Sequence, residues 1–291
     1  MNSLYKSALL IFLEALTPVH VGTGREEAFH VDLPVQRDEF GFPTIWASSL
    51  KGAIKANIKD ANFRRHLGSE PDEPEARPSH ITILDAKLLL IPARTLDNVW
   101  TYVTTPHLLG YLKTYLEVYR DITGSQLALN LASIEQVITK GVTISTKFSE
   151  RVFINETEVE VTQDANLLTK LGLDKILPES LKNSIAAQGL VVIPDKGSKG
   201  LAIIRKSMMI QYRVRLKREE KTVDAGPWSE EYMPTKTALI SIALCRDAQE
   251  KSSVKSAKDL CEEFKSKIGN KSIYIGGKET IGRGLVKIYT G

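Results

Sequence analysis

The sequence has only two cysteines, Cys245 and Cys261, among its 291 residues, and it has no long apolar run. Two cysteines are too few for a disulfide scaffold and lack the spacing of a cysteine-based zinc site, so we expect both thiols to be reduced. The longest apolar run, at 8–13, is far shorter than the roughly 20 residues of a membrane-spanning helix. The first residues also lack the features of a secretory signal. These absences predict a cytoplasmic protein.

Sequence signatures of several enzyme classes are also missing. There is no His-Glu-x-x-His zinc motif, nucleophile elbow or protein-kinase motif set. Residues 277–284 approach a phosphate-binding P-loop, but Arg283 and Gly284 replace its lysine and its magnesium-binding hydroxyl. The residues after this loop predict a strand, whereas a P-loop needs a helix whose N-terminus faces the phosphates. We therefore exclude a P-loop nucleotide triphosphatase.

What is present is an ordinary globular composition, 42% hydrophobic and 25% charged, in a chain long enough for one large or two smaller domains. The formal net charge of +4 is small, but its distribution is uneven. Residues 199–221 carry eight Lys and Arg against two Glu, and residues 48–66 carry five against one Asp. The distribution is more informative than the total, because a local basic surface attracts polyanions.

Apolar patterns predict strands and helices along the chain. The nearly continuous apolar stretch 4–16 predicts a buried first strand. Strands are also expected at 81–91 and 98–105, on either side of a connection at 92–98, and Pro106 opens a helix to about Tyr119. Later strands are expected at about 150–161, 272–275 and 285–289.

The basic block at 48–66 has the pattern of an amphipathic helix. Ser48 and Ser49 are plausible caps, and apolar residues then recur at helical spacing. Lys51, Lys55 and Lys59 follow one another on a neighbouring face. This stripe is either a solvated face or a surface for phosphates.

Two further segments combine cations with an exposed backbone. The strict alternation at 210–217 predicts a strand whose polar face carries Arg213 and Arg215. The loop at 276–284 combines glycines with two cations, namely Gly276, Gly277, Lys278, Gly282, Arg283 and Gly284. Such a loop can approach a polyanionic backbone closely, or it can simply be a tight hairpin that uses glycine for positive φ.

Groups capable of acid–base chemistry gather in two places. The loop after the first strand contains His20, His30 and Asp32, and loops at strand ends often carry function. Residues 228–234 contain Glu230 and Tyr232. The alternative to a catalytic role is that Glu230 and Glu231 are an exposed acidic pair at the end of a strand, with Trp228 and Tyr232 packed in the core.

The order and spacing of these motifs resemble proteins of the RAMP superfamily from CRISPR systems. In the N-terminal part the resemblance rests on residues 17–24, 31–37, 41–43 and 49–52. Further along it rests on residues 84–87, 92–96, 103–106, 228–234 and 276–284. Together these look like the repeated backbone subunit of the type III-B Cmr effector complex, with a match from residue 4 to 289.

The resemblance implies an α+β, ferredoxin-like (RRM-related) core with a protruding β-hairpin. The chain would form a single domain, 1–291, with inserted segments at about 67–80, an acidic loop, at 125–188, and at 210–234, the hairpin. Copies would stack along a CRISPR guide RNA beside other Cmr subunits, and the complex would cut complementary target RNA.

The resemblance also implies roles for individual residues. Asp32 stands at the family position needed for cutting target RNA, and His20, Glu230 and Tyr232 match further active-site positions. Ser49, Lys51, Lys278 and Arg283 match positions that hold the guide. Lys55, Arg213 and Arg215 add cations that suit binding to any RNA backbone.

Cutting can use the 2′-hydroxyl of the RNA as nucleophile, so few protein groups suffice. Asp32 would orient or deprotonate this hydroxyl or hold a divalent ion, with Mg²⁺ the expected metal. His20 would position the reacting groups of the RNA or donate a proton to them. Two alternatives stay open, a guide-processing endoribonuclease of the same superfamily and a subunit that only coats RNA. Stacked copies could also share one site, with Asp32 from one copy and Glu230 and Tyr232 from its neighbour.

Overall fold

A computed structural model describes residues 4–25, 31–69, 77–249 and 254–291 of the chain. Strand β1 (Ser7–Ala15) lies at the centre of the main sheet, antiparallel to β12 (Ala238–Cys245) on one side and to β16 (Leu285–Thr290) on the other. Beyond β12 lie β3 (Ile81–Ile83) and β4 (Ala86–Thr95), and β15 (Ser272–Tyr274) pairs with β16. The predicted first strand is confirmed.

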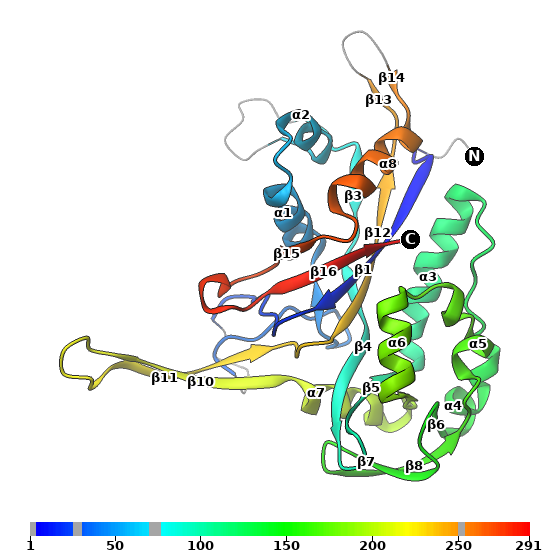
Figure 1. Ribbon diagram of the computed structural model, residues 1–291, viewed down its shortest axis with the longest axis vertical. Helices are drawn as coiled ribbons and strands as arrows, with labels where there is room; N and C mark the ends of the chain where they lie inside the picture. Colours follow the sequence, from blue (N-terminus) through cyan, green and yellow to red (C-terminus); the bar gives the residue numbers. More distant parts are fainter. Residues whose placement is uncertain (1–3, 26–30, 70–76, 250–253) are drawn as a thin grey trace.

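The unbroken apolar character of β1 follows from burial on both faces. Leu9 and Ile11 belong to one hydrophobic core, which α1 (Ala47–Asn57) and α8 (Ala257–Ile268) cover. Leu10 and Phe12 point into a second core, which α3 (Pro106–Thr123) and α6 (Glu179–Gln188) cover. Figure 1 shows the two helix pairs on opposite sides of the sheet. A strand with two buried faces needs no polar alternation.

A second group of strands closes on itself. From β4 the order runs through β5 (Val99–Thr104), β9 (Leu190–Val192), β6 (Thr143–Ser145), β8 (Thr157–Gln163) and β7 (Glu150–Ile154). Strand β7 then returns to β4 through the pairing of Thr95 with Ile154. The segment at 125–188 therefore supplies three strands of this ring together with α6.

Three sequence predictions about the bounds of elements were wrong in detail, two of them in this ring of strands. Strand β4 runs through Pro92 to Thr95, so the turn is shorter than 92–98. Proline is tolerated there because the amide of its partner Tyr102 bonds to the carbonyl of Gly189, which makes Pro92 and Tyr102 a non-hydrogen-bonded pair. The predicted strand at 150–161 is the β7–β8 hairpin, whose turn residues Asn155 and Glu156 both have positive φ.

The third error concerns the start of α1. Its N-cap is Trp46, and Ser48 and Ser49 lie in the first turn instead of capping it. The amides of Trp46 and Ala47 donate instead to side chains that are distant in sequence, those of Gln36 and Asp85. Helix α3 begins at Pro106 as predicted and extends to Thr123, with Thr105 as a side-chain cap.

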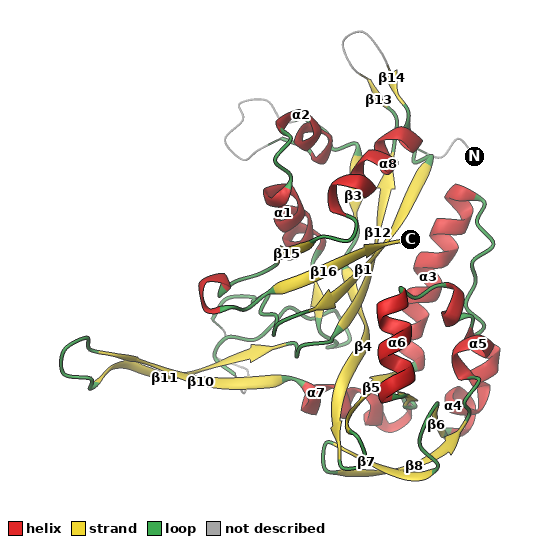
Figure 2. Ribbon diagram, in the orientation of Figure 1, coloured by secondary structure: helices red, strands yellow, loops and turns green. Residues whose placement is uncertain are grey.

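The remaining elements are short, except for one helix and a long hairpin. The short ones are β2 (Thr44–Ile45), α2 (Ala61–Arg64), η1 (Arg65–Leu67), η2 (Leu131–Ile134), α4 (Glu135–Lys140), α5 (Leu167–Leu171), η3 (Leu173–Lys175), η4 (Lys196–Ser198), β13 (Ala248–Gln249), β14 (Val254–Lys255) and η5 (Glu279–Ile281). Helix α7 (Lys199–Ser207) leads into β10 (Met209–Leu216) and β11 (Val223–Tyr232), which protrude from the body as the predicted hairpin (Figures 1 and 2).

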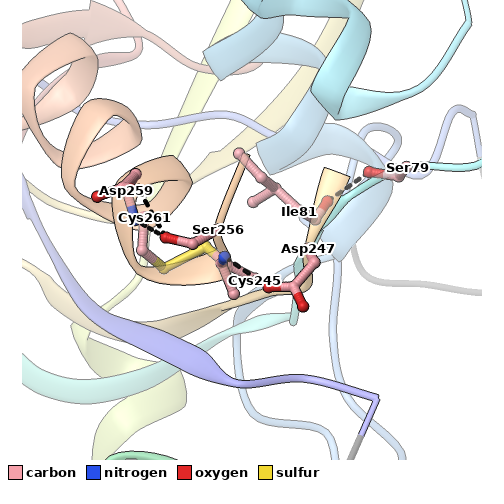
Figure 3. The surroundings of a disulfide bond; sticks show 8 residues. Ser79, Ile81, Cys245, Asp247, Ser256, Asp259 and Cys261 are labelled. Carbon is pink, nitrogen blue, oxygen red and sulfur yellow. Dashed lines mark hydrogen bonds between the residues drawn. A yellow bond between two sulfur atoms is a disulfide. The ribbon is translucent and has the colours of Figure 1, made fainter. Parts of the chain in front are cut away.

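The expectation of two reduced cysteines is contradicted. Cys245, at the end of β12, forms a disulfide with Cys261 in α8, with Cα atoms 5.9 Å apart (Figure 3). Both cysteines are buried. The caps Ser256 and Asp247 fix the start of α8 over β12, and this packing brings the two cysteines together. A pairing of this kind depends on tertiary contact, which spacing alone does not reveal.

Two predicted features fall partly or wholly outside the described residues. Positions 70–76 of the acidic loop at 67–80 are among them, and so is His30. In the part of the chain that the structure describes, no helix combines the length and the apolar character needed to cross a membrane.

Candidate functional site

Three loops meet at the base of the β10–β11 hairpin. Val19 pairs with Met233, and Leu33 pairs with Glu230, so both segments after β1 lie against the end of β11. The glycine-rich loop between β15 and β16 joins them, because the amide of Gly277 donates to the carbonyl of His20. Segments more than 200 residues apart in sequence thus form one site.

Glu230 is the centre of a buried polar cluster. Its side chain has no exposed surface and accepts hydrogen bonds from Lys278 Nζ at 2.7 Å, from Trp228 Nε1 at 2.8 Å and from the Tyr232 hydroxyl. Arg213 Nη1 lies 3.8 Å from it. Burial raises the pKa of Glu230, but these three hydrogen bonds outweigh it and lower the pKa to about 2. Glu230 is therefore a charged anchor at neutral pH.

Tyr232 and Arg283 extend this cluster. Burial, together with the hydrogen bond to Glu230, raises the pKa of Tyr232. The guanidinium carbon of Arg283 lies 5.4 Å from the centre of the Tyr232 ring, in cation–π geometry. Arg283 Nη2 also donates to Gln211 Oε1 at 3.2 Å. The glycine-rich loop is thus held to both strands of the hairpin.

His20 reaches the same cluster from the first loop. Its Nδ1 lies 2.7 Å from the carbonyl oxygen of Glu231, and its ring centre lies 5.4 Å from that of Tyr232. A carbonyl only accepts, so Nδ1 carries the proton in the neutral ring and Nε2 keeps its lone pair. A Cβ at Gly22 would lie 2.7 Å from Nε2, so glycine leaves the space that the imidazole fills.

Asp32 is held by Ser229. Both the amide and the hydroxyl of Ser229 donate to Asp32 Oδ2 at 2.8 Å, and the amide of Asp32 donates to Ser229 Oγ at 2.9 Å. These bonds lower the pKa of Asp32, with the backbone bond as the largest cause. Asp32 is half-buried, and no described residue donates to its other oxygen, Oδ1.

Strand geometry separates the predicted catalytic residues into two groups. Ser229 and Glu230 are neighbours in β11, and their side chains point to opposite faces of the strand. Asp32 bonds to Ser229, so it lies on the face opposite Glu230. His20, Glu230 and Tyr232 form one group, and Asp32 stands alone. The exposed acidic pair considered from sequence is excluded, because Glu230 and Glu231 are both buried.

The glycines of the C-terminal loop divide into two kinds. A Cβ on Gly276 would lie 2.2 Å from the carbonyl oxygen of His20, and one on Gly284 would lie 2.5 Å from that of Ile275. Both also have positive φ, so they are needed for the fold of the loop. Gly277 and Gly282 are exposed, and a Cβ on either meets nothing within 4 Å, although Gly282 also has positive φ and so is favoured by its backbone conformation. Only these two leave open space for a ligand.

The three residues of α1 that were predicted to bind RNA have different surroundings. Lys55 Nζ donates to the carbonyls of Gly68 and Ser69 at 2.9 Å, so it ties the helix to the following segment. Ser49 Oγ accepts from Gln36 Nε2. Lys51 is half-buried in a pocket of about 450 Å³, and burial, aided by the charge of Lys55, lowers its pKa. Lys51 is the better placed of the two lysines to meet a phosphate.

On the hairpin, the two predicted arginines have different surroundings. Arg213 lies near Glu230 at the base, whereas Arg215 forms an exposed ion pair with Asp224 at 2.6 Å. Tyr212 is 74% exposed and stands opposite Ser229 in the ladder, on the face of Asp32. An exposed aromatic ring beside a carboxylate suits the stacking of a nucleobase.

Sequence reasoning missed Ser229 and Glu231. Glu231 is buried, pairs with Arg37 Nη2 at 2.5 Å and accepts from the amide of Val35 at 3.1 Å. The period of two in β11 could have revealed them, because it puts Ser229 and Glu231 on one face and the predicted Glu230 and Tyr232 on the other.

The described residues offer little for a metal ion. They contain no group of three or more His, Cys, Asp or Glu side chains arranged around a common point. Asp32 Oδ1 could serve as one carboxylate ligand, which suffices only for an ion that takes its other ligands from water and phosphate.

Comparisons with known proteins identify the family of the chain. The family model described as the RAMP superfamily matches residues 12–287. A CRISPR system CMR subunit Cmr4 of Saccharolobus solfataricus is 35% identical, over 95% of this chain and 94% of its own. A CRISPR system Cmr endoribonuclease Cmr4 of Pyrococcus furiosus is 30% identical, over 97% of this chain and 95% of its own.

Solved structures are similar over the whole chain. A chain of the type III-B Cmr-beta complex bound to cognate target RNA has a TM-score of 0.78 and 32% identity, with 99% of this chain and 98% of that chain covered. Oligomeric Cmr4 from Pyrococcus furiosus has a TM-score of 0.69 and 25% identity, with 97% of each covered.

Proposed function

The chain belongs to the RAMP superfamily, and from this premise we propose that it is the repeated backbone subunit of a type III-B Cmr complex, which holds guide RNA and cuts complementary target RNA. The observation that carries the proposal is that the loops with Asp32 and His20 and the glycine-rich loop all pack against the base of one hairpin, on its two faces. The near-complete coverage of both Cmr4 relatives supports it.

We assign the main sheet to a ferredoxin-like core. The chain order β1, α1, β3 with β4, β12, α8, β16 is a βαββαβ succession, and its strands lie in the order β16, β1, β12, β3 with β4. Helices α1 and α8 pack on the same hydrophobic core. Residues 125–188 and 210–234 are then insertions into a single domain.

The reaction would be an in-line attack of a 2′-hydroxyl oxygen on the adjacent phosphorus. The new P–O bond closes a 2′,3′-cyclic phosphate, the 2′-hydroxyl gives up its proton to Asp32 or to water, the bond to the 5′-oxygen breaks, and the leaving oxygen takes up a proton. Asp32 Oδ1 belongs to a carboxylate whose pKa the bonds from Ser229 lower further, and it would accept a hydrogen bond from the 2′-hydroxyl and orient it. His20 is only 7% exposed and its Nδ1 is bonded to the carbonyl of Glu231, so Nε2 is the atom that would position the phosphate or protonate the leaving oxygen.

Glu230 and Tyr232 would act indirectly, by holding other side chains of the site in position. Neither has exposed surface, so in this conformation neither can touch RNA. Glu230 instead holds Lys278 through a hydrogen bond, and the ring of Tyr232 contacts Arg283. Both cations are thereby fixed near His20. A divalent ion bound through Asp32 Oδ1 and phosphate oxygens would supply further positive charge.

We place the subunit in the cytoplasm, in copies stacked side by side along the guide with the other Cmr subunits. Basic residues on α1, on the hairpin and on the glycine-rich loop suit binding to a backbone of any sequence, and guide pairing would supply specificity.

One experiment separates this function from the two alternatives. The purified chain is incubated with labelled repeat RNA, and the assembled complex is then given target RNA paired to its guide. We expect no cutting of repeat RNA, cutting of paired target to cyclic-phosphate ends, and no cutting with Asp32→Ala at unchanged target binding. Cutting of repeat RNA by the free chain would favour guide processing, and no cutting at all would favour a coating subunit.

A further inference from the structure

Asp32 and the hairpin are joined by a closed set of hydrogen bonds. The hydroxyl of Ser229 donates to Asp32 Oδ2 and accepts from the amide of Asp32, and the amide of Ser229 donates to the same carboxylate oxygen. Three bonds between two residues fix both the backbone and the carboxylate plane of Asp32. Ser229 is only 4% exposed, so water competes little for these bonds.

A second tie lies two residues further along the same face of β11. Glu231 binds Arg37 through one carboxylate oxygen and the amide of Val35 through the other. The amide of Glu231 also donates to the carbonyl of Leu33. The segment from Asp32 to Arg37 is therefore attached to β11 at both of its ends.

We propose that Ser229 is a positioning residue that, together with Glu231, holds the Asp32 loop against β11 and aims Asp32 Oδ1 at the RNA. The inference deepens the proposed function and rests on it. Since β11 is also a strand of the hairpin whose basic residues suit RNA binding, its position and that of Asp32 are linked.

The reason lies in the geometry of the carboxylate. A carboxylate that orients a hydroxyl must hold one oxygen to a few tenths of an ångström, and a loop side chain reaches this only when its other oxygen is fixed. Here Oδ2 is fixed by Ser229, and no described residue donates to Oδ1. Removal of the Ser229 hydroxyl leaves only the backbone amide on Oδ2, so the carboxylate can rotate.

The test uses the assembled complex with guide RNA and labelled target. Ser229→Ala removes the hydroxyl, and Ser229→Thr keeps it on a residue that suits a strand. The matched control is Ser241→Ala, which removes another buried serine hydroxyl, bonded to the carbonyl of Leu84 at 2.7 Å in the core of the sheet. Single-turnover cutting rate, target Kd and melting temperature are measured for each.

We expect Ser229→Ala to cut roughly tenfold to a hundredfold more slowly at unchanged target Kd, and Ser229→Thr to cut within about threefold of the wild type. Ser241→Ala should lower the melting temperature without changing the rate. Where the threonine variant does not fold, Glu231→Gln replaces it, and this variant should also slow cutting at unchanged Kd.

Wild-type rate in Ser229→Ala beside an inactive Asp32→Ala would overturn the positioning inference alone. An equal loss of rate in Ser241→Ala, a folded but unrestored threonine variant, or a wild-type rate in Glu231→Gln would also overturn it. Undiminished cutting by Asp32→Ala would instead overturn the proposed site.

Discussion

At the scale of single residues, the charge of Glu230 is the clearest case of a group whose properties come from its neighbours. Its carboxylate is buried, yet Lys278, Trp228 and Tyr232 each donate to it. A buried charge is tolerated when it is paired and hydrogen-bonded, and it is strongly destabilising when a partner is lost.

The first prediction is the pH dependence that follows. The pKa of Glu230 is about 2 in the folded chain and near 4.5 in an unfolded one, so its contribution to the free energy of unfolding is present above about pH 4.5 and lost as the pH falls towards 2. The contribution is about 3 kcal/mol. Urea unfolding between pH 6 and pH 3 should therefore show a smaller loss of stability in Glu230→Gln than in the wild type. Parallel losses in the two proteins would contradict the low pKa.

The second prediction concerns Lys51. A half-buried cation with a lowered pKa should gain more from a phosphate than a cation already bonded to carbonyls, as Lys55 is. Lys51→Ala should weaken guide binding equally for all sequences and flatten its salt dependence by about one unit of slope, at unchanged melting temperature. Lys113→Ala is the control, because Lys113 lies on α3 with Glu117 as its partner. A sequence-dependent effect would argue against contact with the RNA backbone.

At the scale of elements, the hairpin is divided into a base that belongs to the fold and an outer part that does not. Residues 229–232 are buried, whereas Val214, Leu216 and Val223 are each close to half exposed or more. Apolar side chains left in solvent on an isolated two-stranded ribbon do not stabilise the chain that carries them. They are available for RNA bases or for a neighbouring copy.

The third prediction is that the outer part serves cutting and not folding. Arg213 and Trp228 pair across the ladder, so residues 214–227 can be replaced by Asn-Gly, which makes a two-residue hairpin turn. The shortened chain should keep its melting temperature and bind guide, but cut paired target far more slowly. A control that exchanges only Val214 and Leu216 for Thr tests whether apolar contact is the cause. Wild-type cutting by the shortened chain would contradict this role.

The fourth prediction concerns the link between β12 and α8. The disulfide joins cysteines 16 residues apart, and closing a loop of this size stabilises a protein by about 3 kcal/mol. Cys245→Ala, Cys261→Ala and the double variant should each lose a similar part of the free energy of unfolding, and dithiothreitol should destabilise the wild type only. Cutting should be unchanged, because neither cysteine lies near the hairpin base. If the losses of the two single variants add up in the double variant, each cysteine contributes through packing, and the disulfide prediction is wrong.

At the scale of the whole molecule, a single chain brings Asp32 beside β11 but directs it away from Glu230. The opposite orientation of these two carboxylates is compatible with the possibility raised from the sequence, that one copy supplies Asp32 and its neighbour supplies Glu230 and Tyr232.

The fifth prediction tests sharing. Asp32→Ala subunits are mixed with His20→Ala subunits on one guide, and each variant is also assembled alone. Shared sites should restore roughly a quarter to a half of the cuts in the mixture, whereas neither pure complex cuts. No recovery in the mixture would show that each copy carries a complete site. His20 is preferred to Glu230 for this test because loss of the buried carboxylate would also reduce stability.

Much of the fold could be predicted from local patterns. The apolar run of β1, the proline that opens α3, the alternation of β10 and the glycines of the last turn each depend on residues a few positions apart, and all four elements are present. The loop with His20 and Asp32 and the segment with Glu230 and Tyr232 were also found from sequence, since residue types and motif order sufficed to select them.

Contacts between distant segments were decided only by the tertiary structure. Four features join residues that no short pattern connects: the closed ring of strands, the disulfide, the hydrogen bonds between Ser229 and Asp32, and the ion pair of Glu230 with Lys278. Burial shows the same division. A glutamate next to a glutamate has the local pattern of a solvated pair, and only the packing of three loops around β11 gives each of these two carboxylates its own partners and removes it from water.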